Sequence, residues 1–174
     1  MTSLEVLDSA IKIGLGALIA ALSTFVITRV QHRNSLRKEA IDREFALLRE
    51  VAEKTERFTH TTLKYWSFAS DWHRALRKDR GTPKPDLLKS SQQELFNHFG
   101  DVTSAEAVLL LLGQEAAQER LRTYGEYVVS FRKEASKTSE PMSEIIIEDY
   151  RKHFLNARAS LFRELHQIYK GLGP

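Results

Sequence analysis

Residues 11–30 read IKIGLGALIAALSTFVITRV, and no other stretch of the 174-residue chain resembles them. The 16 residues from Ile13 to Thr28 carry no charge, and Lys12 and Arg29 bracket them. As a helix this core is about 24 Å long, which is short for a hydrocarbon layer of about 30 Å. The apolar stems of the two basic residues can lengthen it while their charges reach the headgroups. The stretch predicts a transmembrane helix at 11–30, after a short extracytoplasmic tail at 1–10.

Two other interpretations of this stretch stay open. A cleaved signal peptide has a basic start and small residues at its cleavage site. Here the start carries Glu5 and Asp8, and the uncharged core is followed by TRVQHRN, which is a poor cleavage region. A buried helix of a soluble core is also possible at this length, although the absence of charge extends right around the helix. We therefore favour a membrane anchor that is retained in the mature protein.

Basic residues on the two sides of the stretch predict its orientation. Only Lys12 precedes the core, whereas four basic residues follow it closely: Arg29, Arg33, Arg37 and Lys38. Under the positive-inside rule the C-terminal side then lies in the cytoplasm and the N-terminus outside. The same five residues are candidate contacts for anionic lipid headgroups, at about 1 kcal/mol per charge.

One face of the predicted span carries small residues. Gly16, Ala20 and Thr24 recur at every fourth position. This spacing lets two membrane helices approach closely, as in dimers built on small residues four apart. The face is a candidate helix–helix interface for a homo-oligomer, although glycine and alanine are also common in membrane helices that do not associate.

The remainder, residues 31–174, predicts a cytoplasmic all-α domain built as an antiparallel helical bundle. Residues 31–78 contain neither proline nor glycine and predict one long helix, and DRGTPKP at 79–85 predicts a loop. Glycines and capping-box pairs then divide the rest, and Pro141 favours the start of the last helix. The expected helices are about 86–99, 103–112, 114–136 and 141–170. No stretch alternates as a strand does.

Apolar residues, joined by threonines in the long helix, follow heptad-like steps of four and three in these helices, as in coiled coils. In the long helix they include Leu48, Thr55, Thr59, Thr62 and Ala69, with Val51, Phe58, Tyr65 and Trp72 in a second line. In the two last helices they are Ala117, Leu121, Tyr124, Val128, Phe131 and Ala135, then Ile146, Tyr150, Phe154, Ala157, Leu161, Leu165 and Ile168. The run 108–112, VLLLL, is too short to cross a bilayer and predicts a segment buried all round.

Composition excludes several classes of protein. Apolar residues make up 42% of the chain and charged residues 28%, which is typical of a globular domain. The formal net charge of +3 is small and evenly mixed with acids, so we expect no nucleic-acid partner. The chain has no cysteine, which leaves no disulfide framework and no thiolate metal site. The partners we expect are the lipid bilayer, another copy of the chain, or an unidentified protein.

No motif in the sequence carries recognisable chemistry. The six histidines form no HExxH or Glu-x-x-His pair, and no phosphate-binding loop or nucleophile elbow occurs. Glu94 with His98, and Asp149 with His153, have spacings that suit surface ion pairs better than a metal. Asp71, His73 and Arg74 form the densest polar cluster, which a partly exposed helix end explains as well as a site does. We therefore predict no catalytic residue, no metal and no cofactor.

The stretch AEAVLLLLGQEAAQERLRTYGEYVVSFRKEAS, Ala105 to Ser136, combines a short helix, a glycine and a long helix. It resembles the pattern of uncharacterised bacterial proteins with one N-terminal span and a cytoplasmic helical bundle. The resemblance covers layout and about 30 residues and carries no functional residue, so nothing is transferred from it. The predicted span and its basic flank lead us to expect a single-pass protein of the bacterial inner membrane. The sequence favours a non-enzymatic, membrane-anchored protein that acts in assembly or protein–protein interaction. A small membrane effector or sensor that clusters through its span is a second hypothesis, and an enzyme with an unrecognised site is a third.

Overall fold

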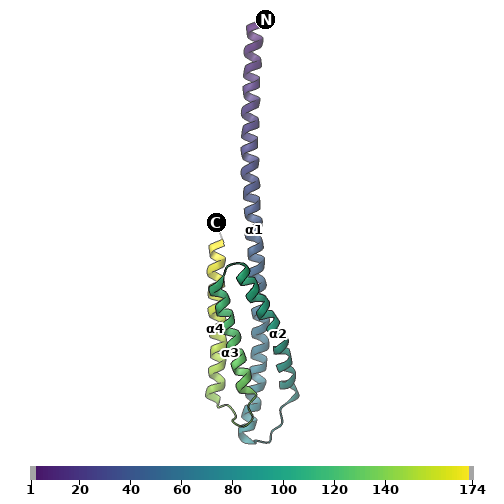
Figure 1. The fold of residues 1–174 in the computed structure, drawn as a ribbon, viewed down its shortest axis with the longest axis vertical. Coiled ribbons are helices and arrows are strands. Elements are labelled where there is room, and N and C mark those ends of the chain that lie inside the picture. The colour runs from purple at the N-terminus through teal and green to yellow at the C-terminus, as the bar shows by residue number, and fades with distance from the viewer. Residues whose placement is uncertain (1–2, 173–174) are drawn as a thin grey trace. The chain divides into compact units, whose positions relative to one another are not determined.

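The computed structural model describes the backbone of residues 3–172 and the side chains of 23–25 and 27–172. It contains four helices, α1 (Ser3–Lys78), α2 (Asp86–Leu111), α3 (Glu115–Ala135) and α4 (Glu144–Leu172) (Figure 1). The chain divides into two compact units, 1–43 and 44–174. The all-α class and the helical bundle predicted from the sequence are confirmed.

In the second unit, the part of α1 from Glu44 onward packs with α2, α3 and α4 as a four-helix bundle (Figure 1). Ion pairs mark which helices are neighbours. Lys64 of α1 pairs with Glu94 of α2 at 2.7 Å. On its other side, α1 pairs with α4 through Glu56 and Arg158, whose charged atoms lie 2.6 Å apart. Short connections make successive helices antiparallel, as expected for this architecture.

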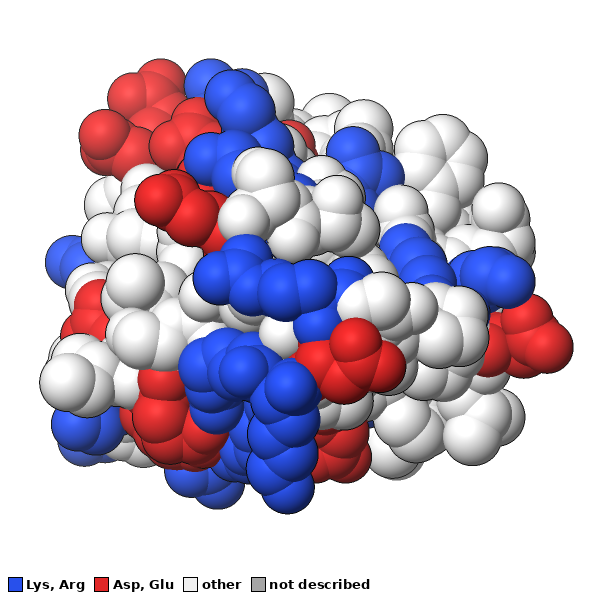
Figure 2. All heavy atoms as spheres, turned by 90° about the horizontal axis from the view of Figure 1, so that it is seen from below, with Lys and Arg blue, Asp and Glu red and all other residues white. Residues whose placement is uncertain are grey.

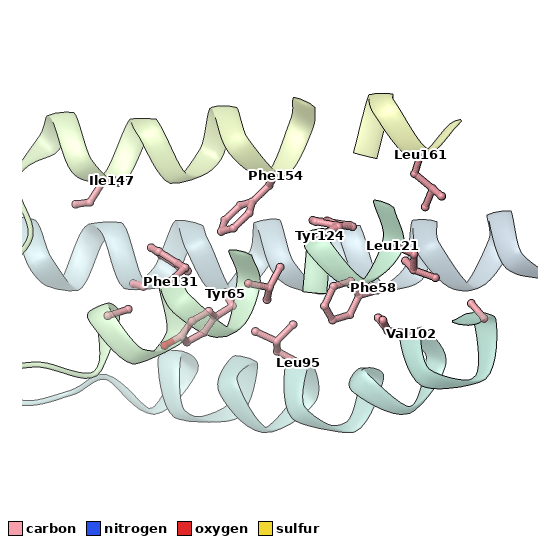
Figure 3. Packing of buried hydrophobic residues seen from close by; sticks show 14 of the residues in the cluster. Phe58, Tyr65, Leu95, Val102, Leu121, Tyr124, Phe131, Ile147, Phe154 and Leu161 are labelled. Atoms are coloured by element: carbon pink, nitrogen blue, oxygen red, sulfur yellow. The ribbon is translucent and has the colours of Figure 1, made fainter. Parts of the chain in front are cut away.

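The core of the bundle is filled by large side chains that are almost inaccessible to solvent (Figure 3). Aromatic rings meet edge to face at its centre, where Phe58 lies 5.5 Å from Tyr124 and Phe131 lies 5.5 Å from Phe154, measured between ring centroids. Such pairs add about 0.5–1.5 kcal/mol to the effect of burial alone. The heptad stripe predicted in 114–136 is confirmed, since its six members are all buried: Ala117, Leu121, Tyr124, Val128, Phe131 and Ala135.

The stripe in the last helix is wrong at its first position. Ile146 is 47% exposed, whereas Ile147 is completely buried. The helix begins at Glu144, after Pro141 rather than with it, and its buried face passes through Ile147, seven residues before Phe154, so that Ile146 points beside that face. From Phe154 through Leu161 to Leu165 the predicted face is the buried one.

The break predicted at Gly100 is also wrong, because α2 continues through it as one helix. The buried positions Leu95, Val102 and Leu109 follow at intervals of seven on both sides of the glycine. A glycine inside a helix costs about 1 kcal/mol relative to alanine. Burial of an uninterrupted apolar face outweighs that cost, so a glycine alone does not end the helix.

The segment 108–112 is not buried all round, as the sequence suggested. Leu109 is fully buried, but Leu110 is 51% exposed and Leu111 is 79% exposed. Successive residues of a helix point about 100° apart, so consecutive leucines cannot all face one core. The helix then ends in a tight turn at Gly113, whose φ of +70° favours glycine.

In the first unit, the described side chains from Ser23 to Ala40 are all exposed. Phe25 is 61%, Ile27 55% and Val30 53% accessible. Among the described residues, no helix combines the length and hydropathy needed to cross a bilayer. Most of the predicted span at 11–30 lies outside the residues whose side chains are described, and so do Lys12, Gly16 and Ala20.

Candidate functional site

The polar cluster that stood out in the sequence, Asp71, His73 and Arg74, is divided between two faces of α1. His73 is completely buried, whereas the Asp71 side chain is 68% exposed. The main-chain N–H of Met142 donates to Nδ1 of His73 at 3.1 Å, so Nε2 carries the ring proton and donates to the Ala135 carbonyl at 3.1 Å. Both ring nitrogens are therefore occupied by backbone groups.

Burial lowers the pKa of His73, and the nearby Arg77 charge acts in the same direction, against the effect of the bond to Ala135. The ring is consequently neutral when the bundle is folded. It connects α1 to the end of α3 and to the segment before α4. Neither nitrogen is left to bind a ligand or move a proton.

Arg74 and Arg77 hold the start of α4 from the outside. Arg74 donates from Nε to both carboxylate oxygens of Glu144, at 3.1 Å each, and Arg77 Nη2 donates to the same carboxylate at 2.9 Å. These bonds lower the pKa of Glu144, with the Arg74 bond as the largest cause. Figure 2 looks onto this end of the molecule, where basic and acidic side chains lie intermixed. These contacts stabilise one end of the bundle. A partly exposed helix end, rather than a functional site, accounts for Asp71, His73 and Arg74.

A second group of polar side chains lies inside the core. The Tyr124 hydroxyl donates to Thr59 Oγ1 at 3.0 Å, and Thr55 and Thr59 donate to carbonyls of their own helix. Burial raises the pKa of Tyr124 to about 12, against the opposing effect of the Thr59 and Thr62 hydroxyls. Because this phenol stays protonated and enclosed, it orders the packing of α3 on α1 and offers no reactive group.

Of the two histidine–carboxylate pairs noted in the sequence, only Asp149 with His153 is in contact. Glu94 pairs with Lys64, and His98 instead lies 2.8 Å from Asp101, measured from Nδ1 to Oδ2. His153 lies 3.4 Å from the carboxylate of Asp149, with both side chains largely exposed. No group of three potential metal ligands occurs within the described part of the chain.

The most developed hollow among those described is an open groove between α3 and α4, with a volume of about 540 Å³. We call it the α3/α4 groove. Small side chains from both helices, Thr123, Ala157 and Ser160, form its middle, and Ala116 lies one helical turn before Arg120 at the arginine end. A larger pair closes each end, Tyr127 with His153 at one and Arg120 with Arg163 at the other. The volume falls within the range of about 300–1,000 Å³ that is usual for small-molecule sites.

The polar groups at both ends of the α3/α4 groove are only partly used by the protein. His153 Nδ1 donates to the Asp149 carbonyl at 2.8 Å, and its ring lies 5.2 Å from that of Tyr127. Arg120 donates to Glu164 at 3.0 Å and to Ser160 at 2.8 Å. Arg163 is exposed and takes part in no ion pair or hydrogen bond among the described residues. The groove therefore has unused bonding capacity at both ends.

Sequence reasoning missed the α3/α4 groove, because it treated His153 as a surface partner of Asp149 and Ala157 as a member of the buried stripe. The available signal was a line of small residues beside the heptad stripe. Alanine, threonine and serine on facing helices leave a hollow that longer side chains would fill. That line becomes meaningful only when the pairing of the last two helices is known.

The basic residues proposed to contact headgroups lie on one helix. Arg29, Arg33 and Arg37 follow one another at every fourth position, which places them along one side of α1, and Lys38 is adjacent. Their side chains are exposed. Thr24, the one member of the small-residue face with a described side chain, is exposed as well. A comparison with known protein families, characterised proteins and solved structures finds no match to this chain.

Proposed function

We propose that the chain is a non-enzymatic, membrane-anchored helical protein that assembles with copies of itself or with another protein at the cytoplasmic face of the cell membrane. Its anchor is the uncharged stretch around residues 11–30, and its cytoplasmic domain is the four-helix bundle. The proposal assigns no catalytic role to the notable polar residues of the bundle, because His73, Arg74 and Tyr124 bond to other helices and loops of the same chain.

One observation carries the proposal of an anchor. Phe25, Ile27 and Val30 expose more than half of their surface, and exposed basic residues begin immediately at Arg29. Soluble helices normally bury large apolar side chains against a neighbour. Exposed apolar side chains followed by basic ones are typical of the place where a membrane helix leaves the bilayer on its cytoplasmic side. There lysine and arginine contact anionic headgroups.

Fractionation and topology reporters test the anchor on the full-length chain. We expect the protein to remain in the membrane pellet after carbonate and high-salt washes. A C-terminal fluorescent fusion should be bright, and a C-terminal alkaline phosphatase fusion inactive, because that enzyme needs the extracytoplasmic space. Extraction by carbonate would refute the anchor, whereas an active phosphatase fusion would refute only the orientation.

The small-residue face supports assembly through the anchor. We propose that Gly16, Ala20 and Thr24 form the contact between copies, since glycine and alanine allow membrane helices to approach closely. Crosslinking in membranes should give dimers of the full chain that are strongly reduced by Gly16→Leu together with Ala20→Leu. The matched control, Leu15→Ala with Ile19→Ala, changes the neighbouring face and should leave the dimers intact. Equal crosslinking of all three proteins would refute this contact.

A further inference from the structure

We propose that the α3/α4 groove binds a nucleoside monophosphate. The inference rests on the geometry of the bundle alone and does not depend on the membrane anchor. The two ends of the groove present different chemistry, and the small side chains between them leave room for a molecule that reaches both.

The end formed by Arg120 and Arg163 suits an oxyanion. Arg120 uses Nε for Glu164 and Nη1 for Ser160, and Nη2 has no partner among the described residues. Glu164 neutralises part of the Arg120 charge, and Glu119 also borders the groove. Arg163, unlike Arg120, forms no ion pair among the described residues, so it supplies the charge that this end offers. Guanidinium groups bind phosphate oxygens through charge-assisted hydrogen bonds.

The other end suits a flat ring that carries a hydrogen-bond donor. The Tyr127 and His153 rings lie 5.2 Å apart and are tilted by 41°, which forms an aromatic wall. His153 Nδ1 donates to the Asp149 carbonyl, so Nε2 is the ring nitrogen left to accept a hydrogen bond, and no described residue bonds to it. An exocyclic amino group of a nucleobase can donate to this nitrogen while the base stacks on the wall.

The spacing of the two ends agrees with one ligand rather than two. Tyr127 follows Arg120 by seven residues on α3, which corresponds to about 10 Å along a helix. Arg163 follows His153 by ten residues on α4, about 15 Å, so the long Arg163 side chain has to extend back toward the middle of the groove. A nucleoside monophosphate can reach across this distance with its base at the Tyr127 end and its phosphate at the Arg163 end. The ribose would then lie over the small side chains of the middle, where Ala157 and Ser160 leave the space.

The direct test is a titration of the full-length protein in detergent micelles, followed through ¹³C-labelled alanine methyl groups. Adenosine monophosphate should shift the methyls of Ala116 and Ala157, which line the groove, and leave those of Ala69 and Ala105 in the core unchanged. Inorganic phosphate and adenosine, the two halves of the probe, should each bind at least tenfold more weakly.

Two variants make the assignment specific. Arg163→Gln should weaken binding of adenosine monophosphate at least fivefold, and Ala116→Leu should block it by filling the groove; both residues are exposed, so the bundle should stay folded. The control Arg49→Gln removes an exposed arginine that lies outside the groove and should bind normally. No shift with the probe, shifts spread over the whole protein, or unchanged binding in Arg163→Gln would each overturn the proposal. Binding of phosphate alone with equal strength would overturn the role of the aromatic end.

Discussion

The two units of this chain use apolar residues in opposite ways. In the bundle, side chains such as Phe131 and Leu161 are completely buried against other helices of the same chain. In the N-terminal unit, Phe25 and Leu36 expose 61% and 52% of their surface. Burial of apolar surface stabilises a fold by about 25 cal/mol per Å². Among the described side chains, those of the bundle bury such surface against other helices of the same chain, whereas Phe25 and Leu36 do not. The stability of the fold should therefore reside in the bundle, and the N-terminal unit should depend on its surroundings.

The largest effect is expected when large side chains of the bundle core are replaced by alanine. Phe131→Ala and Leu161→Ala should each lower the free energy of unfolding by about 2–5 kcal/mol, because each leaves a cavity among fully buried neighbours. Urea unfolding of the full-length protein in micelles, followed by circular dichroism, measures this loss. On the same helix as Leu161, the partly exposed Leu155 provides the control, and Leu155→Ala should cost much less. Equal losses for the two leucines would mean that the core is assigned to the wrong face of α4.

The next effect concerns the buried His73, which bonds to the backbone of Ala135 and Met142 at the end of the bundle. The pKa of His73 is lowered in the folded state, so the unfolded chain, with an ordinary pKa near 6.5, binds the proton first. Stability should be complete above about pH 6.5 and decrease as the pH falls below it, by at most about 1.4 kcal/mol per pH unit for one proton. Urea midpoints measured at pH 7.5 and pH 5.5 give this slope.

A matched pair of histidine variants assigns the slope to His73. His73→Gln should be less stable at pH 7.5, because the backbone groups of Ala135 and Met142 lose their partner, but its midpoint should change less between the two pH values. His60→Gln, at an exposed position of α1, should retain the wild-type slope. An unchanged slope in His73→Gln would show that another group titrates in this range.

The bundle was predictable from the sequence to the extent that its helices repeat regularly. All six positions that steps of three and four predicted in α3 are buried, since burial on a helix follows the same period, but the buried Gln118 and Gly125 were not predicted. The failures came where a local signal competed with packing. Gly100 predicted a break that the continuous buried face from Leu95 to Leu109 overrides. The α3/α4 groove could not be predicted, because it depends on which helices pair.

A smaller effect is expected when each of two glycines, Gly100 inside α2 and Gly113 in the turn after it, is replaced by alanine. Gly100 is exposed within α2, and a Cβ added there would meet nothing within 4 Å. Gly100→Ala should therefore raise the free energy of unfolding by about 0.5–1 kcal/mol through helix propensity alone. Gly113→Ala should lower it, because alanine disfavours the φ of +70° in the turn before α3. Urea midpoints of the two variants should move in opposite directions, and a loss of stability in Gly100→Ala would show that the helix needs its glycine.

The smallest effect is expected in the N-terminal unit, where an exposed leucine can be compared directly with a buried leucine of the bundle. Leu36→Ala removes a large apolar side chain that is 52% exposed, so the free energy of unfolding of the bundle should change by less than about 0.5 kcal/mol. The matched change in the bundle is Leu161→Ala, which removes the same atoms from a fully buried site. Both variants are measured by urea unfolding in the same micelles, so that the environment of the N-terminal unit is held constant. A loss above 1 kcal/mol in Leu36→Ala would mean that this part of α1 contributes to the folded core, and the division of the chain after Arg43 would then not separate stability from anchoring.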